Sequence, residues 1–386
     1  MLPPFFRFGR SYTKVSAGVE TSPGLTPSND RPRLGELFAF RRFRWLAGAL
    51  VGVVFLTAFY AKSDRIPAIR TSSASSSQQQ TKDNVDWSRF AYVQYATNTP
   101  YLCNSVMFFE RLEHLQSKPD RVLLYPSYML DPQAKVGDSE EARLLIRARD
   151  VYRVKLVPIT VQHRDGDDPT WAESFTKLLS FNQTQYQRTM SIDSDSTLQK
   201  HMDELFLLPP CPLVATRAYW LPPNERPKLN SQLMVIEPSE AEFARVAAKI
   251  ESAGPGDFDM EIVDNMYKES AMILPHRPYL LLTGTLRGEH ADWWLGNSEE
   301  AWDPVAAYNN ASLVHFSDWP RPKPWLPAAA DAVEKMRPKC VMKDGAKDCS
   351  AAVIWDGIYA DFAARRKVSR GCSTNKHIKT SLINIP

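Results

Sequence analysis

The sequence predicts an α/β fold with a mostly parallel central sheet, preceded by one transmembrane helix. Three observations lead to this prediction. Strand-like and helix-like segments alternate between residues 90 and 193, residues 45–61 form an uncharged apolar run, and apolar residues make up 44% of the 386-residue chain. That share of apolar residues is enough for a sizeable core, so we expect the body of the chain to be globular.

The alternation can be followed segment by segment. Apolar, β-rich runs predict strands at 90–96, 121–126, 154–161 and 188–193. Between them, helical spacing of apolar residues predicts helices at 101–115, 140–152 and 171–183. This alternation favours a mostly parallel sheet, in which ligands collect beyond the carboxyl ends of the strands. Near the end of the chain, residues 354–367 predict a basic-faced helix that packs on the core.

Residues 45–61, "WLAGALVGVVFLTAFYA", contain no charged side chain and are flanked by "RRFR" and "KSDR". A helix of this length would span roughly 26 Å, the short end of what crosses a bilayer. A buried core helix would be more amphipathic, and a cleaved signal peptide would not follow 44 residues. Residues 1–44 carry eight Arg and Lys against three Asp and Glu, which places the amino terminus in the cytosol. We expect a single-pass, type II signal anchor.

Composition divides the chain into four parts. Residues 1–44 are expected to be a disordered cytosolic tail, 45–61 the anchor, 62–86 a flexible lumenal stem, and 87–386 the folded lumenal domain. Residues 62–386 carry 39 Arg and Lys against 41 Asp and Glu, and this balance argues against nucleic-acid binding. Of the five cysteines, Cys340 and Cys349 are close enough to close a small loop, and the odd count leaves at least one thiol unpaired or intermolecular.

Asp193 and Asp195 stand one residue apart where a predicted strand ends, in "SIDSDSTLQK". Two carboxylates at this spacing on a regular strand point to one face, where a cation between them would offset their repulsion. The triplet at 165–167 reads as a solvated turn, and the triplet at 257–259 is a further Asp-x-Asp candidate. We therefore expect a divalent metal at Asp193 and Asp195.

Four blocks in order, "YVQYATNTPYLCNSV", "TKLLSFNQTQYQRTMSIDSDSTLQKHMDELF", "LNSQLMVIEPS" and "VHFSDWPRPKPW", resemble glycosyltransferase family 8. Members of this family are retaining enzymes with the GT-A fold, a Rossmann-like nucleotide-sugar-binding fold, and they include glycogenin. The blocks are most similar to a fungal Golgi branch that is labelled glucose N-acetyltransferase and contains N-acetylglucosaminyltransferases. The resemblance extends over about residues 88–370, so residues 87–386 would be the catalytic domain.

The resemblance implies a role for residues in the first two blocks. Thr97, Asn98 and Tyr101 would contact the uracil and ribose of a UDP-sugar, and an aromatic residue beside small polar groups suits this task. Lys177, sixteen residues before Asp193 as in the family, would reach the phosphates or the sugar.

The resemblance also implies the metal ligands. Asp193 and Asp195 match the family's Asp-x-Asp, and His315 matches its third protein ligand. Two hard oxygens and an imidazole fit Mn²⁺ better than Ca²⁺. Lys323, in "KPW", would neutralise charge on the leaving phosphate. Its spacing from His315 is two residues longer than in the family.

On the sugar side, Asn230 and Ser231 match the family's N-S-G, with Gln232 in place of the glycine. Asp259 aligns with the aspartate of a D-Q-G segment that lies beside the donor sugar, and Met260 stands where the family has an amide. The third Asp-x-Asp triplet thus resembles a carboxylate on the sugar side rather than a second metal site.

Together these features predict a Golgi enzyme that transfers GlcNAc from UDP-GlcNAc to a mannose-containing glycan, with Mn²⁺ and with retention of configuration. Two alternatives stay open. The same fold could use another nucleotide-sugar donor, or the chain could be a catalytically inactive lumenal scaffold that binds glycans.

Overall fold

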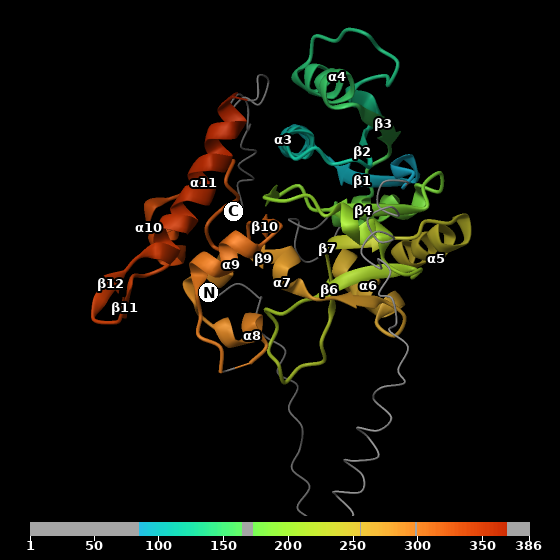
Figure 1. Ribbon diagram of the computed structural model, residues 1–386. Coiled ribbons are helices and arrows are strands. Elements are labelled where there is room, and N and C mark those ends of the chain that lie inside the picture. The colour runs from blue at the N-terminus through green and yellow to red at the C-terminus, as the bar shows by residue number, and fades with distance from the viewer. Residues whose placement is uncertain (1–84, 164–172, 255, 298, 369–386) are drawn as a thin grey trace, which may run out of the picture. The chain divides into compact units, whose positions relative to one another are not determined.

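The computed structural model describes residues 85–163, 173–254, 256–297 and 299–368 (Figure 1). The expected tail, the expected anchor and almost all of the expected stem lie outside these residues. Within the described ranges, no helix is both long enough and apolar enough to span a membrane. The division of the chain into four parts therefore stays a prediction.

A seven-stranded sheet forms the centre of the fold, in the order β3-β2-β1-β4-β7-β6-β8. Its strands are β1 (Phe90–Tyr95), β2 (Asp120–Pro126), β3 (Val154–Ile159), β4 (Arg188–Ile192), β6 (Leu213–Arg217), β7 (Leu229–Ile236) and β8 (Met272–Leu274). The pairs β1–β2, β2–β3, β1–β4 and β6–β8 are parallel. Only β7 runs antiparallel to its neighbours β4 and β6. The prediction of a mostly parallel α/β sheet is confirmed.

The order of the strands reverses between β1 and β4. From β1 the chain adds β2 and β3 on one side, and β4 then joins the other edge of β1. In open α/β sheets, ligands bind beyond the carboxyl ends of the strands at such a reversal. The residues that follow β1 and β4 are therefore the first place to look for a binding site.

A second, three-stranded sheet stands next to this reversal. Its strands are β5 (Ser196–Leu198), β10 (Leu313–His315) and β9 (Leu280–Leu282), with β10 in the middle. The register pairs His315 with Ser196 across the antiparallel strands β5 and β10. This pairing brings His315 beside Asp195, although 119 residues separate the two in sequence.

Helices cover the sheets (Figure 1). The α-helices are α3 (Thr99–His114), α4 (Glu140–Tyr152), α5 (Glu240–Glu251), α6 (Asp259–Tyr267), α7 (His276–Tyr279), α8 (Ala291–Leu295), α9 (Pro304–Asn310), α10 (Ala330–Met336) and α11 (Ser350–Val368). The 3₁₀ segments are η1 (Trp87–Arg89), η2 (Ser127–Met129), η4 (Ser174–Asn182), η5 (Asp203–Leu207) and η6 (Thr283–Arg287). Helix α11 confirms the helix expected at 354–367, and it packs beside α3 and η6.

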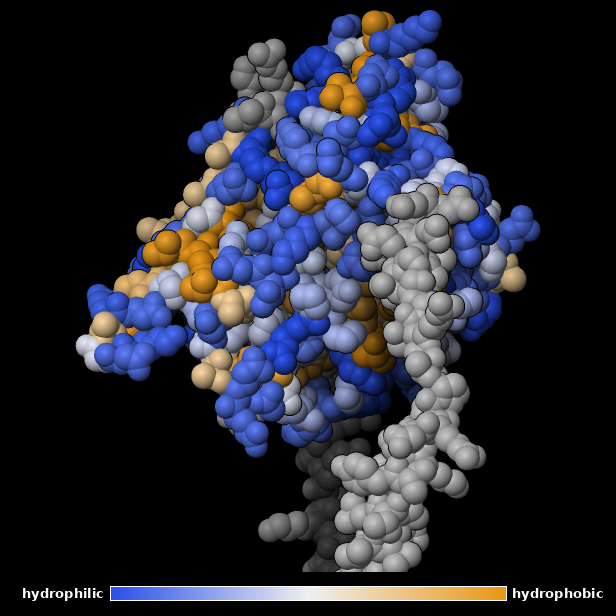
Figure 2. Space-filling model, in the orientation of Figure 1, coloured by the Kyte–Doolittle hydropathy of each residue, from blue (hydrophilic) through white to orange (hydrophobic). Residues whose placement is uncertain are grey.

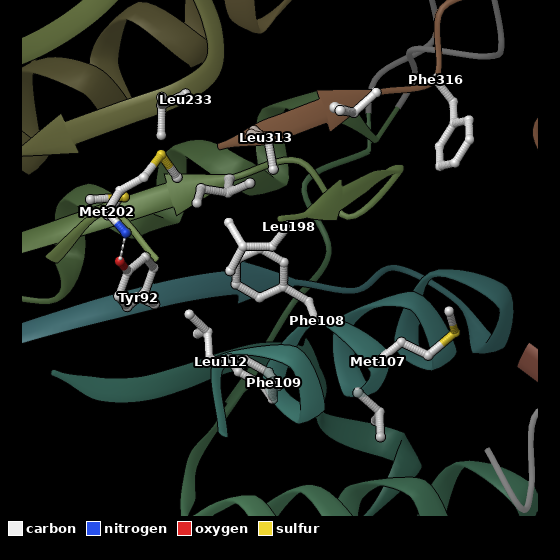
Figure 3. Packing of buried hydrophobic residues seen from close by; sticks show 14 of the residues in the cluster. Tyr92, Met107, Phe108, Phe109, Leu112, Leu198, Met202, Leu233, Leu313 and Phe316 are labelled. Carbon is white, nitrogen blue, oxygen red and sulfur yellow. Dashed lines mark hydrogen bonds between the residues drawn. The ribbon is translucent and has the colours of Figure 1, made fainter. Parts of the chain in front are cut away.

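Side chains of the sheet alternate between two apolar layers, as a pleated strand requires. On β7, Leu233 and Val235 face the layer of α3, α4 and α11, while Met234 and Ile236 face the layer of η4, α5 and α6. Figure 3 shows the first layer, where side chains of α3 lie against Tyr92 and Leu198. The Tyr92 hydroxyl also accepts a hydrogen bond from the Met202 N–H at 2.8 Å. The sheet is thus buried on both faces.

Most of the predicted elements are confirmed with small shifts at their ends. The helix expected at 101–115 begins at Thr99, because Asn98 caps it and Pro100 occupies its first turn. The helix expected at 171–183 is confirmed over its described part, where it is the 3₁₀ helix η4. Three of its buried polar residues, Ser174, Lys177 and Ser180, recur every three positions, which is the period of a 3₁₀ helix rather than of an α-helix.

Near the end of the described chain, β11 (Val341–Lys343) and β12 (Ala346–Asp348) form a hairpin. A disulfide joins Cys340 to Cys349 at its base, as the sequence predicted. Cys211 is a free thiol. Figure 2 shows a mostly hydrophilic face in this view, with apolar residues in small patches.

Candidate functional site

Asp193 and Asp195 follow β4 at its carboxyl end, where the strand order reverses. The Asp193 N–H donates to the Gln232 carbonyl of β7 at 3.1 Å, which continues the β4–β7 pairing by one residue. The Asp195 carbonyl accepts from the N–H of Phe316 at 3.1 Å, which extends the β5–β10 pairing. The segment between the two aspartates is therefore held by both sheets.

The three residues expected to bind a metal come together. Ligand atoms of Asp193, Asp195 and His315 all lie within 4.8 Å of one another. His315 Nε2 is 3.1 Å from Asp195 Oδ1. Two partly buried carboxylates and an imidazole are a donor set that suits a divalent cation such as Mn²⁺. The residues therefore fit the group that the Asp-x-Asp pattern implies, and they do not select one ion.

The side chain of Gln232 contacts the imidazole ring of His315. Its side-chain nitrogen Nε2 lies 3.3 Å from His315 Nδ1, on the side of the ring away from Asp195. Rotation of the Gln232 amide would present its oxygen Oε1 to a protonated Nδ1 of His315. Nε2 of His315 would then be free to bind a metal. Gln232 fills the position of the family's glycine, and nothing in the sequence indicates this contact.

Two lysines balance the charge of the two aspartates. Lys177 Nζ lies 2.6 Å from Asp193 Oδ1 and 2.7 Å from Asp259 Oδ2, and only 4% of its side chain is exposed. Lys323 Nζ lies 2.6 Å from Asp195 Oδ2 and also donates to the Phe316 carbonyl at 2.5 Å. The longer spacing between His315 and Lys323 thus still delivers Lys323 to the acidic cluster.

Burial and neighbouring charges shift the pKa values of Asp193 and Asp195 in opposite directions. Burial raises the pKa of Asp193 above its usual value, and Lys177 only partly opposes this. Burial would also raise the pKa of Asp195, but His315 and Lys323 outweigh it and hold that pKa well below its usual range. Burial would lower the pKa of Lys177, yet Asp193 and Asp259 together raise it. Asp195 and Lys177 are therefore held in their charged forms.

On the sugar side, the structure joins three of the predicted residues into one buried chain. Asp259 is the first residue of α6, where the helix dipole favours a negative charge. The Ser231 hydroxyl donates to Asp259 Oδ2 at 2.6 Å, and Lys177 links Asp259 to Asp193. Asn230 is also buried, but its amide donates to Thr216 Oγ1 at 3.1 Å rather than to this chain.

The residues predicted to hold the base follow β1. Asn98 caps α3, and its side-chain oxygen accepts from the Tyr101 N–H at 3.3 Å. Thr97 precedes it and is buried. The Tyr101 ring packs edge-on against Trp325 of the "KPW" segment, with 5.3 Å between ring centroids. The first block and the last block of the sequence pattern are thus in direct contact.

Sequence reasoning missed one buried cation in this region. Arg366 of α11 donates to the Pro100 carbonyl at 3.0 Å and to the Asn104 side chain, and its guanidinium lies 5.8 Å from the Trp325 ring centroid. Burial lowers its pKa to about 10. In the sequence, Arg366 is one member of an "RRK" run at a helix end, which reads as a solvated face. Only the packing of α11 on α3 reveals its position.

No model of a protein family matches this chain. It is 42% identical to "Glucose N-acetyltransferase 1" of Aspergillus fumigatus over 304 residues, which covers 74% of this chain and 78% of that protein. It is 53% identical to the protein of the same name in Gibberella zeae over 285 residues, 73% of this chain, and spans 63% of that protein's length.

Solved structures similar to the chain include the WbbM bifunctional glycosyltransferase, at 13% identity and a TM-score of 0.46, covering 63% of this chain and 47% of that one. Another is the glycosyltransferase GlyE of Streptococcus pneumoniae, at 13% identity and a TM-score of 0.43, covering 71% and 64%.

The fold and the acidic cluster define a mostly parallel α/β protein with a candidate divalent-metal site, and its curated relatives are proteins named as transferases. More narrowly, the chain belongs to the family of fungal proteins named Glucose N-acetyltransferase 1. The resemblance noted in the sequence is confirmed.

Proposed function

We propose that the protein transfers GlcNAc from UDP-GlcNAc to a mannose-containing glycan, with Mn²⁺ and with retention of anomeric configuration. The observation that carries this proposal is the cluster of Asp193, Asp195 and His315 at the carboxyl end of β4. The name shared by the fungal relatives supports GlcNAc as the transferred sugar. The proposal includes a Golgi membrane location with a lumenal catalytic domain, as the sequence of residues 1–61 predicts.

In this proposal, Asp193, Asp195 and His315 hold the Mn²⁺ ion. When bound, the ion supplies positive charge and Lewis acidity to the diphosphate of the donor. Thr97, Asn98 and Tyr101 bind the uracil and ribose at the end of β1. The contact between Tyr101 and Trp325 then places the "KPW" segment next to the nucleotide.

Lys323 is the residue suited to stabilise the leaving diphosphate. Its ammonium lies on Asp195, at the cluster where the diphosphate would bind. Negative charge grows on the phosphate as the bond from C1 to oxygen breaks, so a cation at this place stabilises the transition state more than the ground state.

Lys177 and Asp259 organise the sugar side. The ammonium nitrogen of Lys177 contacts one carboxylate oxygen of Asp193 and one of Asp259, so it fixes these two side chains relative to each other. Asp259 keeps its charge there, since Lys177 outweighs the effect of burial and lowers its pKa. A carboxylate held in this way could accept a hydrogen bond from a sugar hydroxyl or stabilise positive charge at C1.

Retention of configuration requires the acceptor to attack from the face that the leaving group vacates. A phosphate oxygen of the donor would then serve as the base for the acceptor proton, and no protein nucleophile is needed. This route assigns the chain the tasks of binding, orienting and charge stabilisation.

The test begins with donor binding by the full-length chain in detergent. We expect UDP to raise the thermal stability when Mn²⁺ is present, by about 2.7 kcal/mol at a hundredfold excess over Kd. Asp195→Asn should abolish this rise. Asp344→Asn is the matched control, because Asp344 is exposed in the β11–β12 turn, with a positive φ that asparagine tolerates.

Release of UDP from a panel of UDP-sugars then identifies the donor. UDP-GlcNAc is expected to be consumed fastest by the wild-type chain. Faster consumption of another UDP-sugar would support the alternative donor. If the wild-type chain shows neither stabilisation by UDP nor turnover of any UDP-sugar, the alternative of a catalytically inactive, glycan-binding scaffold would be supported.

A further inference from the structure

One tryptophan near the acidic cluster is exposed and has no ring contact. Trp319 is 61% exposed, and it is the one tryptophan among the exposed large apolar residues of the described chain. Every other tryptophan in the described residues packs on a neighbouring aromatic or histidine ring. Exposing so large a ring forgoes the burial that stabilises the others, so its placement calls for an explanation.

Trp319 lies in a loop whose two ends meet at Asp195. The loop begins at Phe316, where β10 ends (Figure 3), and the Phe316 N–H donates to the Asp195 carbonyl. It closes at Lys323, whose ammonium contacts both the Asp195 carboxylate and the Phe316 carbonyl. Three extended residues span at most about 11 Å, so the Trp319 Cα lies within that distance of the Phe316 Cα.

The residues on both sides of Trp319 are anchored. Asp318, whose side chain is 0% exposed, accepts from Trp355 Nε1 at 2.8 Å and from the Tyr359 hydroxyl at 3.0 Å, and it pairs with Arg287. On the other side, the Arg321 guanidinium stacks 3.5 Å from the centroid of the Tyr359 ring. Trp319 therefore projects from a loop that is fixed to α11 and η6.

An anchored, exposed aromatic ring is suited to bind a flat apolar face. Because the loop is already ordered, it loses little conformational entropy when a ligand stacks on Trp319. Pyranose rings present such a face of C–H groups. We propose that Trp319 binds a pyranose ring of the acceptor glycan and orients it toward the acidic cluster.

The acceptor is favoured over the donor as the ligand of Trp319. The residues suited to the donor sugar, Asp259 and Ser231, lie on α6 and β7 and reach the cluster through Lys177 at Asp193. Trp319 belongs to the loop that reaches the cluster at Asp195. This assignment of the ligand rests on the proposed glycosyl transfer.

The test measures binding of oligosaccharides directly. Mannose, galactose and N-acetylglucosamine oligosaccharides are titrated by calorimetry into the full-length chain loaded with UDP and Mn²⁺. Trp319→Ala and Trp319→Leu should raise the Kd of the preferred series about 3- to 10-fold, the loss expected for one aromatic stacking contact. Trp319→Phe, which keeps a planar face, should remain within about 2-fold. Tyr128→Ala removes another exposed aromatic, outside the loop, and should change nothing.

Thermal stabilisation by UDP and Mn²⁺ reports separately on the donor site and the fold of each variant, and it should be the same in all of them. If this stabilisation and donor turnover are normal but the Kd for oligosaccharides is unchanged in Trp319→Ala, the Trp319 proposal is overturned alone. If no oligosaccharide binds the wild type, it is likewise overturned. If oligosaccharide binding depends on Trp319 while no donor is turned over, the glycan-binding role of Trp319 stands, and its assignment to an acceptor fails together with the proposed transferase function.

Discussion

The ammonium nitrogen of Lys177 lies 2.6 Å from Oδ1 of Asp193, and the same nitrogen contacts Asp259. Lys177→Met would leave the buried Asp259 carboxylate and the partly buried Asp193 carboxylate without their cation. We expect the free energy of unfolding to fall by about 3–5 kcal/mol, measured by urea denaturation at neutral pH. Lys155→Met removes a more exposed pair with Asp120 and should cost no more than about 1 kcal/mol. Equal losses in the two variants would contradict a compensating role for Lys177.

Gln232 should set the affinity for the metal through His315. Gln232→Leu removes the amide beside Nδ1 of His315, which then loses the partner that fixes its orientation. We expect the affinity for Mn²⁺ in the presence of UDP to fall by about 10-fold or more, measured by calorimetry. Gln199→Leu is the control, since Gln199 Nε2 donates to the Tyr308 carbonyl. An unchanged affinity in Gln232→Leu would show that His315 needs no such support.

Acid should weaken the fold through Asp264, away from the acidic cluster. Asp264 accepts from the Leu229 N–H at 3.0 Å and pairs with Arg226. Burial alone would raise its pKa, but these donors outweigh it and hold the pKa below its usual value. A depressed pKa in the folded state means that the stabilisation is complete above about pH 4 and is lost as pH falls through the folded pKa.

The comparison of wild type with Asp264→Asn isolates this effect. The difference between their free energies of unfolding should be constant from about pH 8 to pH 5 and should shrink toward pH 3, measured by urea denaturation at each pH. A difference that grows toward acid pH would have the wrong sign for a depressed pKa.

Arg366 should stabilise the first turn of α3 and the "KPW" segment together. Arg366→Met removes the donor of the buried Asn104 side chain and of the Pro100 carbonyl. We expect a loss of about 1–3 kcal/mol in the free energy of unfolding and a higher KM for the nucleotide-sugar with a smaller change in kcat. Lys367→Met, at the next, exposed position, should change neither quantity. A fall in kcat alone would argue against a positioning role.

The sequence was sufficient for the elements whose signals are local. The strands from β1 to β4 and the helices α3 and α4 each carry their own periodicity and caps, and their order implies a parallel sheet. Asp193 and Asp195 could be recognised because they are neighbours at a strand end. His315 was found only through the resemblance, since its place beside Asp195 arises from the pairing of β10 with β5.

Contacts between distant segments could not be predicted in this way. Nothing near Asp318 in sequence indicates that Trp355 and Tyr359 would donate to it, because those residues lie on a helix more than thirty positions later. In the sequence, Gln232 stands out only because it replaces a glycine of the family, and its contact with His315 depends on β7 and β10 meeting at the cluster. Such residues become recognisable once tertiary packing places their polar atoms.

The period of three in η4 has a consequence for how this segment tolerates change. Ser174, Lys177 and Ser180 form one row, and Phe175, Leu178 and Phe181 form the adjacent row in the apolar layer. A substitution that preserves polarity alters one position of one row. The deletion of a single residue before Lys177 would instead rotate the remaining turns by about a third of a circle, so that Leu178 would meet the carboxylates. The insertion of a single residue would rotate them the other way and bring Lys177 into the apolar row, at the place of Leu178. For this segment, spacing is a stricter requirement than residue identity.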